Sequence, residues 1–208
     1  MTHVRRIILK EALSIFKACD KIISCRFLFR LVYRFVLYYL SRSGPMAEEV
    51  MILYNSAKAI NARTIVELGV EDGTSTRALL TACYELNAHL WSVDIAPCVQ
   101  TRRRIEDLFL SRFWTFTQQD DLEFVKKWNK PIDLLFIDTS HQYEHTKEEL
   151  LQYSRFVVKG GRIFLHDSSS ERYPGVARAI SNFLHNHSSF EYREHHTRNG
   201  LADLIKIN

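Results

Sequence analysis

The stretch TIVELGVEDGTS, residues 64–75, decides the fold class of this chain. Its first five residues, 64–68, are mostly β-branched or apolar and predict a strand. Glycines at positions 69 and 73 mark a loop, and apolar residues at helical spacing predict a helix from Thr74 to Leu86. A strand that leads through a glycine-containing loop into a helix is typical of the first half of a βαβ unit. The chain is therefore expected to form an α/β fold.

The loop between this strand and helix argues against two common kinds of phosphate-binding site. It has no GxxxxGK[ST] sequence, so it is not a P-loop. A dinucleotide-binding loop has three glycines and leaves the helix N-terminus free for pyrophosphate, whereas Glu71 and Asp72 place negative charge there. Because like charges repel, the loop favours a cofactor that lacks phosphate and carries positive charge.

The alternation of strand and helix continues to the C-terminus. Strands are expected at residues 64–68, 89–94, 113–117, 132–138, 162–166, 190–194 and 201–207, and helices at residues 46–62, 74–86, 99–110, 122–128, 143–156 and 176–187. The run Lys159-Gly160-Gly161 is interpreted as the glycine stop of the preceding helix, and Asn199-Gly200 as the turn of a final hairpin. These elements predict an α/β, doubly wound, Rossmann-like, mostly parallel sheet with a C-terminal antiparallel hairpin.

A carboxylate stands at or just after the end of each of the first five strands. These residues are Glu67, Asp94, Asp120, Asp138 and Asp167. In open α/β sheets ligands bind at the carboxyl ends of the parallel strands, so the five acids are expected to surround one site. Such a ring of acids suits a cation, hydroxyl groups or a metal ion.

Length and composition indicate one globular domain with a basic extension. The chain has 208 residues, of which 46% are hydrophobic and 25% charged, and a net charge of +4. Residues 1–42 carry a net charge of +7, so residues 43–208 are net acidic at −3, and Ser43-Gly44-Pro45 marks the boundary. The four cysteines show no metal-ligand spacing, so reduced thiols and a cytoplasmic location are expected.

The basic extension, residues 1–42, is expected to form an amphipathic helical arm. Arg26, Arg30 and Arg34 recur every four residues and share one helix face, with apolar and aromatic residues between them. A transmembrane helix is disfavoured, because each arginine costs about 2.5–3.5 kcal/mol at the bilayer centre. Two interpretations stay open: a helix that packs on the domain or on a second subunit of a homodimer, and a helix that lies on an anionic membrane surface.

Several motifs resemble those of a known enzyme family. Residues 67–73, Asp94 and residues 119–124 are similar to the first three motifs of class I methyltransferases, which use S-adenosylmethionine (SAM). The segments IDTSHQY (137–143) and VKGGRIFLHD (158–167) resemble the signature IDGxHxY … GGx(hydrophobic)HD of a small-molecule O-methyltransferase branch. That branch also includes cephalosporin-hydroxylase-like proteins and antibiotic-sugar O-methyltransferases.

The resemblance covers about residues 46–207 and implies SAM as the methyl donor. The sulfonium and amino groups of SAM also suit the acidic loop. The methionine end is expected against the Glu67 side of the loop, the ribose diol against Asp94, and the adenine edge beside Asp120. The expected cofactor-binding residues are Glu67, Gly69, Gly73, Ser75, Asp94 and Asp120. A helix cap or an exposed strand-end acid is the alternative role for Glu67 and Asp120.

The expected catalytic residues are Asp138, His141, His166 and Asp167, which follow the fourth strand or end the fifth. A general base or a divalent cation can activate a hydroxyl for methyl transfer. An imidazole base, either His141 or His166, is preferred because imidazole titrates near neutral pH. The resemblance also implies a cation such as magnesium held by Asp138 and Asp167, although a mixed His–Asp pair suits magnesium less well than two carboxylates. Thr139 stands where the motif has glycine.

Together these features favour an enzyme that transfers a methyl group from SAM to a hydroxyl of a small molecule or sugar by in-line displacement. Two alternatives stay open: a nucleic-acid methyltransferase, and a non-enzymatic protein that retains the fold. The acidic charge of residues 43–208 and the lack of a basic groove with interleaved aromatic residues argue against nucleic acid as the partner. Peripheral membrane contact through residues 1–42 stays an option for this otherwise cytoplasmic chain.

Overall fold

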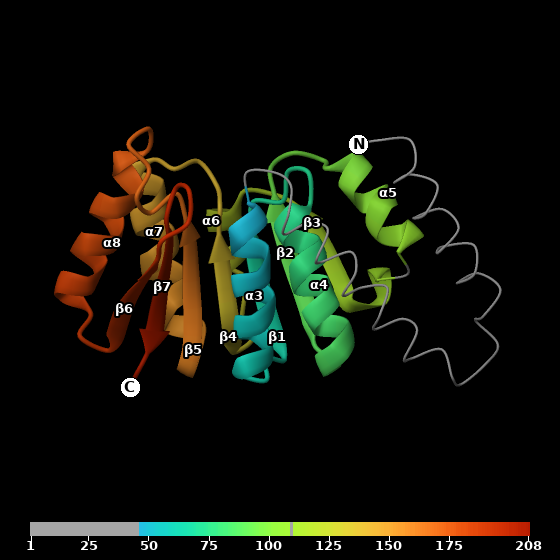
Figure 1. The fold of residues 1–208 in the computed structure, drawn as a ribbon, viewed down its shortest axis with the longest axis horizontal. Helices are drawn as coiled ribbons and strands as arrows, with labels where there is room; N and C mark the ends of the chain where they lie inside the picture. The colour runs from blue at the N-terminus through green and yellow to red at the C-terminus, as the bar shows by residue number, and fades with distance from the viewer. Residues whose placement is uncertain (1–45, 109) are drawn as a thin grey trace.

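The computed structural model describes residues 46–108 and 110–208, so the predicted arm of residues 1–42 lies outside the described residues. Helices cover both faces of a single sheet (Figure 1). The strands are β1 (Thr64–Leu68), β2 (His89–Asp94), β3 (Trp114–Gln118), β4 (Ile132–Ile137), β5 (Val157–His166), β6 (Phe190–His195) and β7 (Leu201–Lys206). The helices are α3 (Ala47–Ala59), α4 (Thr74–Leu86), α5 (Val99–Asp107), α6 (Asp121–Val125), α7 (Tyr143–Tyr153) and α8 (Pro174–Asn186). In this part of the chain, no helix has the length and hydropathy needed to cross a bilayer.

The sheet has seven strands in the order β3-β2-β1-β4-β5-β7-β6. Strands β1 to β5 run parallel, and β7 pairs antiparallel with both β5 and β6. The predicted mostly parallel sheet with an antiparallel C-terminal hairpin is therefore confirmed. Strands β1 and β4 are neighbours in the sheet although two strands separate them in sequence. Such a switch in strand order opens a crevice at the carboxyl ends of the strands.

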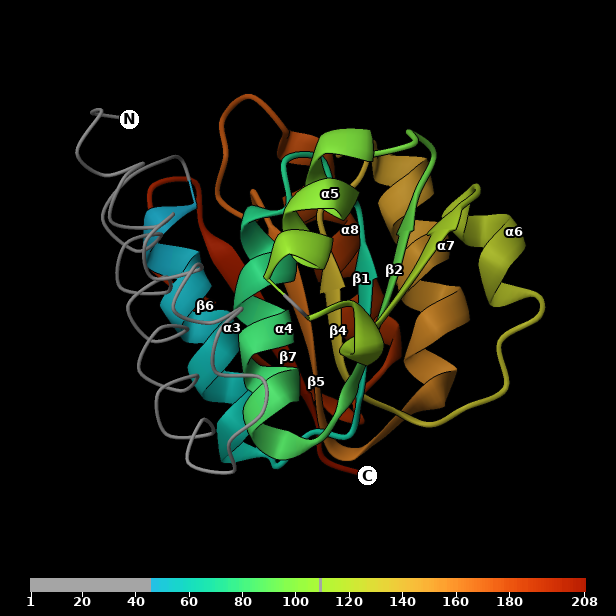
Figure 2. The same cartoon turned by 90° about the vertical axis from the view of Figure 1, so that its right-hand side faces the viewer.

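Each face of the sheet packs against its own hydrophobic core. In β4, Leu134 and Phe136 face the core formed with α3, α4 and α5, while Leu135 and Ile137 face the core formed with α6, α7 and α8. Figure 2 shows the two helical layers on opposite sides of the sheet. Burial on both faces explains the nearly continuous apolar sequence of β4. Burial of each such side chain contributes roughly 1.5–3 kcal/mol.

The glycine pair interpreted as a helix stop lies inside a strand, so that prediction is wrong. Helix α7 ends at Tyr153, a short 3-10 turn follows, and β5 begins at Val157, earlier than predicted. The pairing of β4 with β5 shifts register where Gly160 and Gly161 lie. Gly160 has a φ of +78°, and a Cβ on Gly161 would press on the carbonyl of Val158. The glycines therefore permit an irregular stretch of strand rather than a helix C-terminus.

A buried ion pair joins β5 to β7. Arg162 Nε donates to Asp203 Oδ1 at 3.0 Å, and Nη2 of the same guanidinium contacts the other carboxylate oxygen. The Asp203 side chain is fully buried, and His195 Nε2 lies 3.4 Å from its Oδ2.

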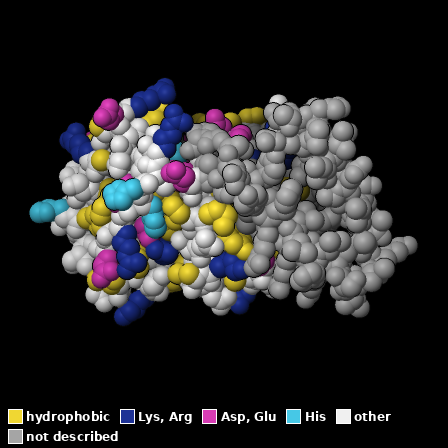
Figure 3. Space-filling view, viewed as in Figure 1, with side chains coloured by type: hydrophobic (Ala, Val, Ile, Leu, Met, Phe, Trp, Pro, Cys, Tyr) yellow, Lys and Arg dark blue, Asp and Glu magenta, His cyan; other side chains and the backbone are white. Residues whose placement is uncertain are grey.

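Figure 3 shows the distribution of charged side chains on one face of the molecule. Basic, acidic and histidine side chains are interspersed on the described part of that face. This side of the described region therefore presents no large patch of a single charge.

Candidate active site

A cleft of about 560 Å³ lies at the carboxyl ends of the parallel strands. It is lined by Met46, Gly69, Val70, Glu71, Asp72, Thr74, Ser75, Val93, Asp94, Ile95, Gln119, Asp120, Asp121, Asp138, Thr139, Ser140, His141, His145 and Tyr173. Residues after β1, β2, β3 and β4 all contribute, so the predicted meeting of strand ends occurs. The volume is within the range of pockets that hold small molecules and cofactors.

The two glycines after β1 allow close backbone approach. Gly69 has a φ of +87°, and a Cβ there would overlap the carbonyl oxygen of Asp138. Gly73 has a φ of +76°, and a Cβ there would overlap the side chain of Thr101. Both positions therefore require glycine for conformation and for space. Gly69 lines the cleft, whereas Gly73 lies at the start of α4 behind the wall.

Glu67 points away from the cleft, in contrast to its expected position beside the cofactor. Its fully buried carboxylate accepts hydrogen bonds from Ser75 Oγ at 2.7 Å, Thr76 Oγ1 at 2.9 Å and Ser92 Oγ at 2.6 Å. Burial raises its pKa to about 7, although the three hydroxyl donors lower it. Glu67 thus joins the first turn of α4 to β1 and β2, and it supports the loop between β1 and α4 from the side opposite the cleft.

Asp94 and Asp120 both line the cleft and both organise backbone. Asp94 Oδ2 accepts from the backbone N–H of Val70 at 2.8 Å and of Glu71 at 3.1 Å, and its Oδ1 accepts from Ala96 N–H at 2.7 Å. Asp120 caps α6, because its Oδ1 accepts from the backbone N–H of residue 123 at 3.0 Å. The helix-cap role considered for Asp120 is therefore present. Each carboxylate oxygen has two lone pairs, so the three backbone donors leave one lone pair of Asp94, on Oδ1.

Asp138, His141, His166 and Asp167 come together in one group, which we call the His–Asp cluster. His141 Nε2 lies 3.1 Å from Asp138 Oδ1 and 3.0 Å from Asp167 Oδ2. His166 Nδ1 lies 3.4 Å from the same Asp138 oxygen and 3.2 Å from the same Asp167 oxygen. Asp138 and His141 line the cleft, whereas His166 and Asp167 are buried behind them. Of the two candidate bases, His141 is therefore the one that faces a ligand.

Two members of the His–Asp cluster have left-handed backbone conformations. The φ angles are +58° at His141 and +59° at Asp167. This conformation costs a non-glycine residue about 1–3 kcal/mol and persists where the surrounding structure enforces it, often at functional sites. The His141 ring is also stacked on Tyr173, with centroids 4.4 Å apart and planes at 20°. Backbone strain and stacking together fix the orientation of the imidazole.

The charges of the His–Asp cluster stabilise one another. Burial opposes ionisation of Asp138, but contacts with His141 and His166 outweigh it and lower its pKa to about 2. Burial also opposes protonation of His166, but Asp138, Asp167 and Glu49 together raise its pKa to about 9. Glu49 comes from α3, and its Oε1 lies 4.0 Å from His166 Nε2. At neutral pH the structure therefore holds an imidazolium at His166 beside an ionised Asp138.

Comparison with known proteins identifies the family. Residues 66–168 match the family model described as a methyltransferase domain. The chain contains a methyltransferase domain. A search of curated proteins found no match to this methyltransferase.

Solved structures share the fold of the methyltransferase at low sequence identity. Cofactor-bound Rv0187 from MTB superposes with a TM-score of 0.69 and 17% identity, covering 85% of this chain and 90% of that one. The O-methyltransferase TomG from Streptomyces achromogenes, in complex with SAM, has a TM-score of 0.66 and 14% identity over 78% of this chain and 81% of its own. The O-methyltransferase from Bacillus cereus, in complex with SAH, has a TM-score of 0.66 and 15% identity over 95% of this chain and 90% of its own.

The His–Asp cluster of the methyltransferase has a geometry that fits a divalent ion. One nitrogen or oxygen atom from each of the four side chains lies within 4.8 Å of the others. Two imidazole nitrogens and two carboxylate oxygens suit zinc, manganese or iron better than magnesium, which prefers an all-oxygen shell. The magnesium expected from the sequence resemblance therefore fits this donor set less well than a transition metal.

Sequence analysis did not assign Ile95, Glu49 or Tyr173 to the site of the methyltransferase. Ile95 follows the strand-end acid Asp94, lines the cleft and is 78% exposed. An apolar residue directly after a strand-end acid is a signal that sequence reading could have used. Glu49 gave no such signal, because an acid in the first turn of a helix usually stabilises the helix dipole.

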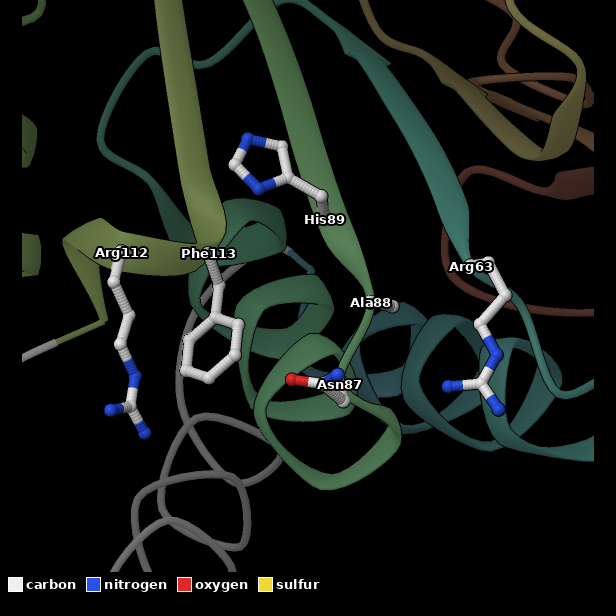
Figure 4. Close-up of a pocket in the computed structure, with 6 residues that line it drawn as sticks. All are labelled: Arg63, Asn87, Ala88, His89, Arg112 and Phe113. Carbon is white, nitrogen blue, oxygen red and sulfur yellow. The ribbon is translucent and has the colours of Figure 1, made fainter.

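A second hollow of about 460 Å³ lies at the opposite, amino-terminal ends of β1, β2 and β3. It is lined by Arg63, Asn87, Ala88, His89, Arg112 and Phe113 (Figure 4). The guanidinium groups of Arg63 and Arg112 lie on opposite sides of the view instead of converging. This hollow also contains none of the strand-end acids, so the cleft remains the candidate active site of the methyltransferase.

Proposed function

We propose that the chain transfers the methyl group of SAM to a hydroxyl of a small molecule or sugar. The observation that carries this proposal is that residues suited to the methyl donor and residues suited to the acceptor line the same cleft. Its wall includes both the glycine loop with Gly69 and Asp94, which suits the donor, and Asp138 with His141, which suits an acceptor hydroxyl. An in-line displacement requires donor and acceptor to lie side by side in this way.

The donor half of the cleft offers complementary groups for each part of SAM. The remaining lone pair on Asp94 Oδ1 can accept a hydrogen bond from the ribose diol. Exposed Ile95 offers an apolar surface for the adenine ring, with Asp120 at its edge. Glu71 and Asp72 carry negative charge toward the positively charged methionine end, which lies over Gly69 in this arrangement.

The acceptor half of the cleft holds the base. In the proposed reaction the C–S bond breaks as a C–O bond forms, and the electron pair stays on sulfur to give S-adenosylhomocysteine. The hydroxyl proton passes to Nδ1 of His141, because Nε2 carries the hydrogen that faces Asp138 and Asp167. This use of an ionised acid to orient an imidazole base follows the logic of catalytic triads. Tyr173 holds the His141 ring in place by stacking.

A metal-assisted reaction is the second candidate, and the close approach of four ligand atoms in the His–Asp cluster favours it. Asp138 and Asp167 would hold the ion, with the imidazoles completing its ligands. A bound divalent ion supplies Lewis acidity that lowers the pKa of an acceptor hydroxyl. Activity that survives exhaustive chelation would support the His141 base, and activity that is lost and restored by added metal would support the ion.

The test of the donor site is calorimetric titration of the purified chain with SAM. Wild-type protein is expected to bind SAM saturably, and Asp94→Ala to bind it at least about 10-fold more weakly, because hydrogen bonds to a charged group contribute about 1.5–3 kcal/mol. Asp107→Ala, at the exposed end of α5, is the matched control and is expected to bind normally. Absence of binding by the folded wild type would overturn the proposal.

We also propose a location and an assembly for the enzyme. In the described residues Cys83 and Cys98 are free thiols, which supports a reducing, cytoplasmic environment. For residues 1–42 both proposals are kept, namely packing on this domain or a second subunit, and contact with an anionic membrane. Co-sedimentation with anionic and with neutral vesicles separates them, because only membrane contact predicts binding to the anionic vesicles.

A further inference from the structure

A second group of titratable side chains lies between α6 and α7. It consists of Asp121, His145 and Glu149, which we call the α6–α7 cluster. Asp121 is the first residue of α6, and His145 and Glu149 are one turn apart on α7. His145 Nε2 lies 3.1 Å from Asp121 Oδ1 and 3.6 Å from Glu149 Oε1. The α6–α7 cluster shares no residue with the His–Asp cluster.

These separations match the coordination shell of a small divalent ion. Metal bonds to histidine nitrogen and carboxylate oxygen are about 2.0–2.2 Å long. Neighbouring ligands at that radius are about 3.0 Å apart in an octahedral shell and about 3.4 Å apart in a tetrahedral one. The three ligand atoms of the α6–α7 cluster, all within 4.8 Å of one another, need little movement to reach either arrangement.

One carboxylate oxygen of each acid in this cluster is buried without a donor from another kind of side chain. The Glu149 side chain is 0% exposed, and among the described residues its Oε2 and the Oδ2 of Asp121 can be matched only by a proton that the two acids share. A buried acid without a donor is costly unless a proton or a cation occupies the space beside it.

Hydrogen bonds from neighbouring hydroxyl groups hold the residues of the α6–α7 cluster in place, as is usual for metal ligands. Thr139 Oγ1 donates to Glu149 Oε1 at 2.8 Å, so the threonine that replaces the glycine of the motif orients a carboxylate. Tyr153 O–H donates to the backbone carbonyl of Asp121 at 2.8 Å and fixes the start of α6 against α7. Hydrogen bonds of this kind orient metal ligands and tune their affinity.

We propose that Asp121, His145 and Glu149 bind a divalent transition-metal ion of the zinc type at the wall of the cleft. One nitrogen and two oxygen ligands suit zinc or cobalt better than calcium or magnesium. Asp121 and His145 line the cleft, whereas Glu149 lies behind them. The ion therefore joins α6 to α7 and keeps a coordination position open toward a bound molecule, as three-ligand sites do. This inference does not depend on methyl transfer.

The test is the number of metal ions bound by the full-length chain. Protein freed of metal with a chelator is equilibrated with Zn²⁺, and bound zinc is measured by atomic emission. The variants His145→Ala and Glu149→Gln are compared with wild type and with His185→Ala, which removes an exposed histidine from α8. Asp138→Asn reports separately on zinc held by the His–Asp cluster. Co²⁺ absorption spectra provide a second readout of ligand geometry.

The ion of the α6–α7 cluster is expected to be retained by wild type, His185→Ala and Asp138→Asn. The variants His145→Ala and Glu149→Gln are each expected to bind one ion per chain fewer than the control His185→Ala. Circular dichroism verifies that each variant is folded, and His145→Gln replaces any variant that is not. The proposal is overturned if wild type binds no zinc, or if His145→Ala binds as much as His185→Ala. A loss seen only in Glu149→Gln also contradicts it, because the histidine would then not be a ligand.

Discussion

Replacement of Glu67 by glutamine is expected to change how stability depends on pH. Burial raises the pKa of Glu67 to about 7 in the folded protein, against 4.5 for an ordinary glutamate. The folded chain therefore holds a proton on Glu67 more tightly than the unfolded chain does. The stability that this proton contributes is fully present below pH 4.5 and is lost as the pH rises through 7. The sign is opposite to that of an ion-paired carboxylate.

The expected magnitude follows from the difference between these two pKa values. At about 1.4 kcal/mol per pKa unit, it corresponds to about 3 kcal/mol of unfolding free energy. Glutamine has the same shape as protonated glutamate, and its amide can pair with the hydroxyls of Ser75, Thr76 and Ser92. The Glu67→Gln variant is therefore expected to keep the fold and to lose this part of the pH dependence.

The assay is urea denaturation between about pH 5 and pH 8, followed by tryptophan fluorescence. Trp114 is a local reporter, because its Nε1 donates to Ser92 Oγ at 2.8 Å and Ser92 in turn donates to Glu67. Wild type and the exposed control Glu106→Gln are expected to lose about 2.5 kcal/mol more than Glu67→Gln across this range, because the window begins just above the unfolded pKa of 4.5. Parallel curves for wild type and Glu67→Gln would refute the reasoning, because they would show that Glu67 has a similar pKa folded and unfolded.

Three further substitutions test other parts of the structure. Gly69→Ala is expected to lower the unfolding free energy by more than about 2 kcal/mol, since its Cβ overlaps the Asp138 carbonyl at a φ of +87°, and chemical denaturation measures this. His141→Ala is expected to reduce kcat by about 10²- to 10⁴-fold while calorimetry shows unchanged SAM affinity, whereas weakened SAM binding would contradict its role as the base. Asp203→Ala is expected to cost about 3–5 kcal/mol by leaving Arg162 buried and unpaired, and a loss below about 1 kcal/mol in urea denaturation would show that solvent reaches that pair.

The sequence was sufficient to predict the layout of the sheet. In β1 and β2 the apolar side chains are bounded by glycine or polar residues, so both strands have their predicted bounds. Three of the five strand-end acids, Asp94, Asp120 and Asp138, line one cleft because parallel strands all present their carboxyl ends to the same edge. Local pattern is a strong guide where one structural period runs uninterrupted from one turn to the next.

The direction in which a strand-end side chain points could not be predicted from the local sequence. Glu67 stands at a strand end like Asp94, but it points inward because Ser75, Thr76 and Ser92 supply donors beneath the loop. Similarly, Asp121 precedes His145 by 24 residues, and only the packing of α6 on α7 brings them together. Pairings of this kind depend on tertiary contacts that no local pattern encodes.

Several helices and strands begin or end at other residues than the sequence predicts. Helices α5 and α6 end at Asp107 and Val125, earlier than predicted. In β5 the pair Gly160-Gly161 gave a local signal for a helix stop, but pairing with β4 extends the strand across it. Tertiary hydrogen bonding outweighed the local preference of glycine at that position.

The contact between Gly69 and Asp138 has a consequence for how the two halves of the cleft influence each other. The loops after β1 and β4 meet backbone to backbone, and Asp138 N–H donates to the Leu68 carbonyl at 2.8 Å. With no side chain between them, a displacement of the first loop is transmitted to Asp138. A methyl donor that settles on the first loop therefore also sets the position of the acid that meets the acceptor. Under the proposed function the two binding sites are therefore coupled through this backbone contact, and whatever factor one substrate applies to the affinity of the other is returned unchanged.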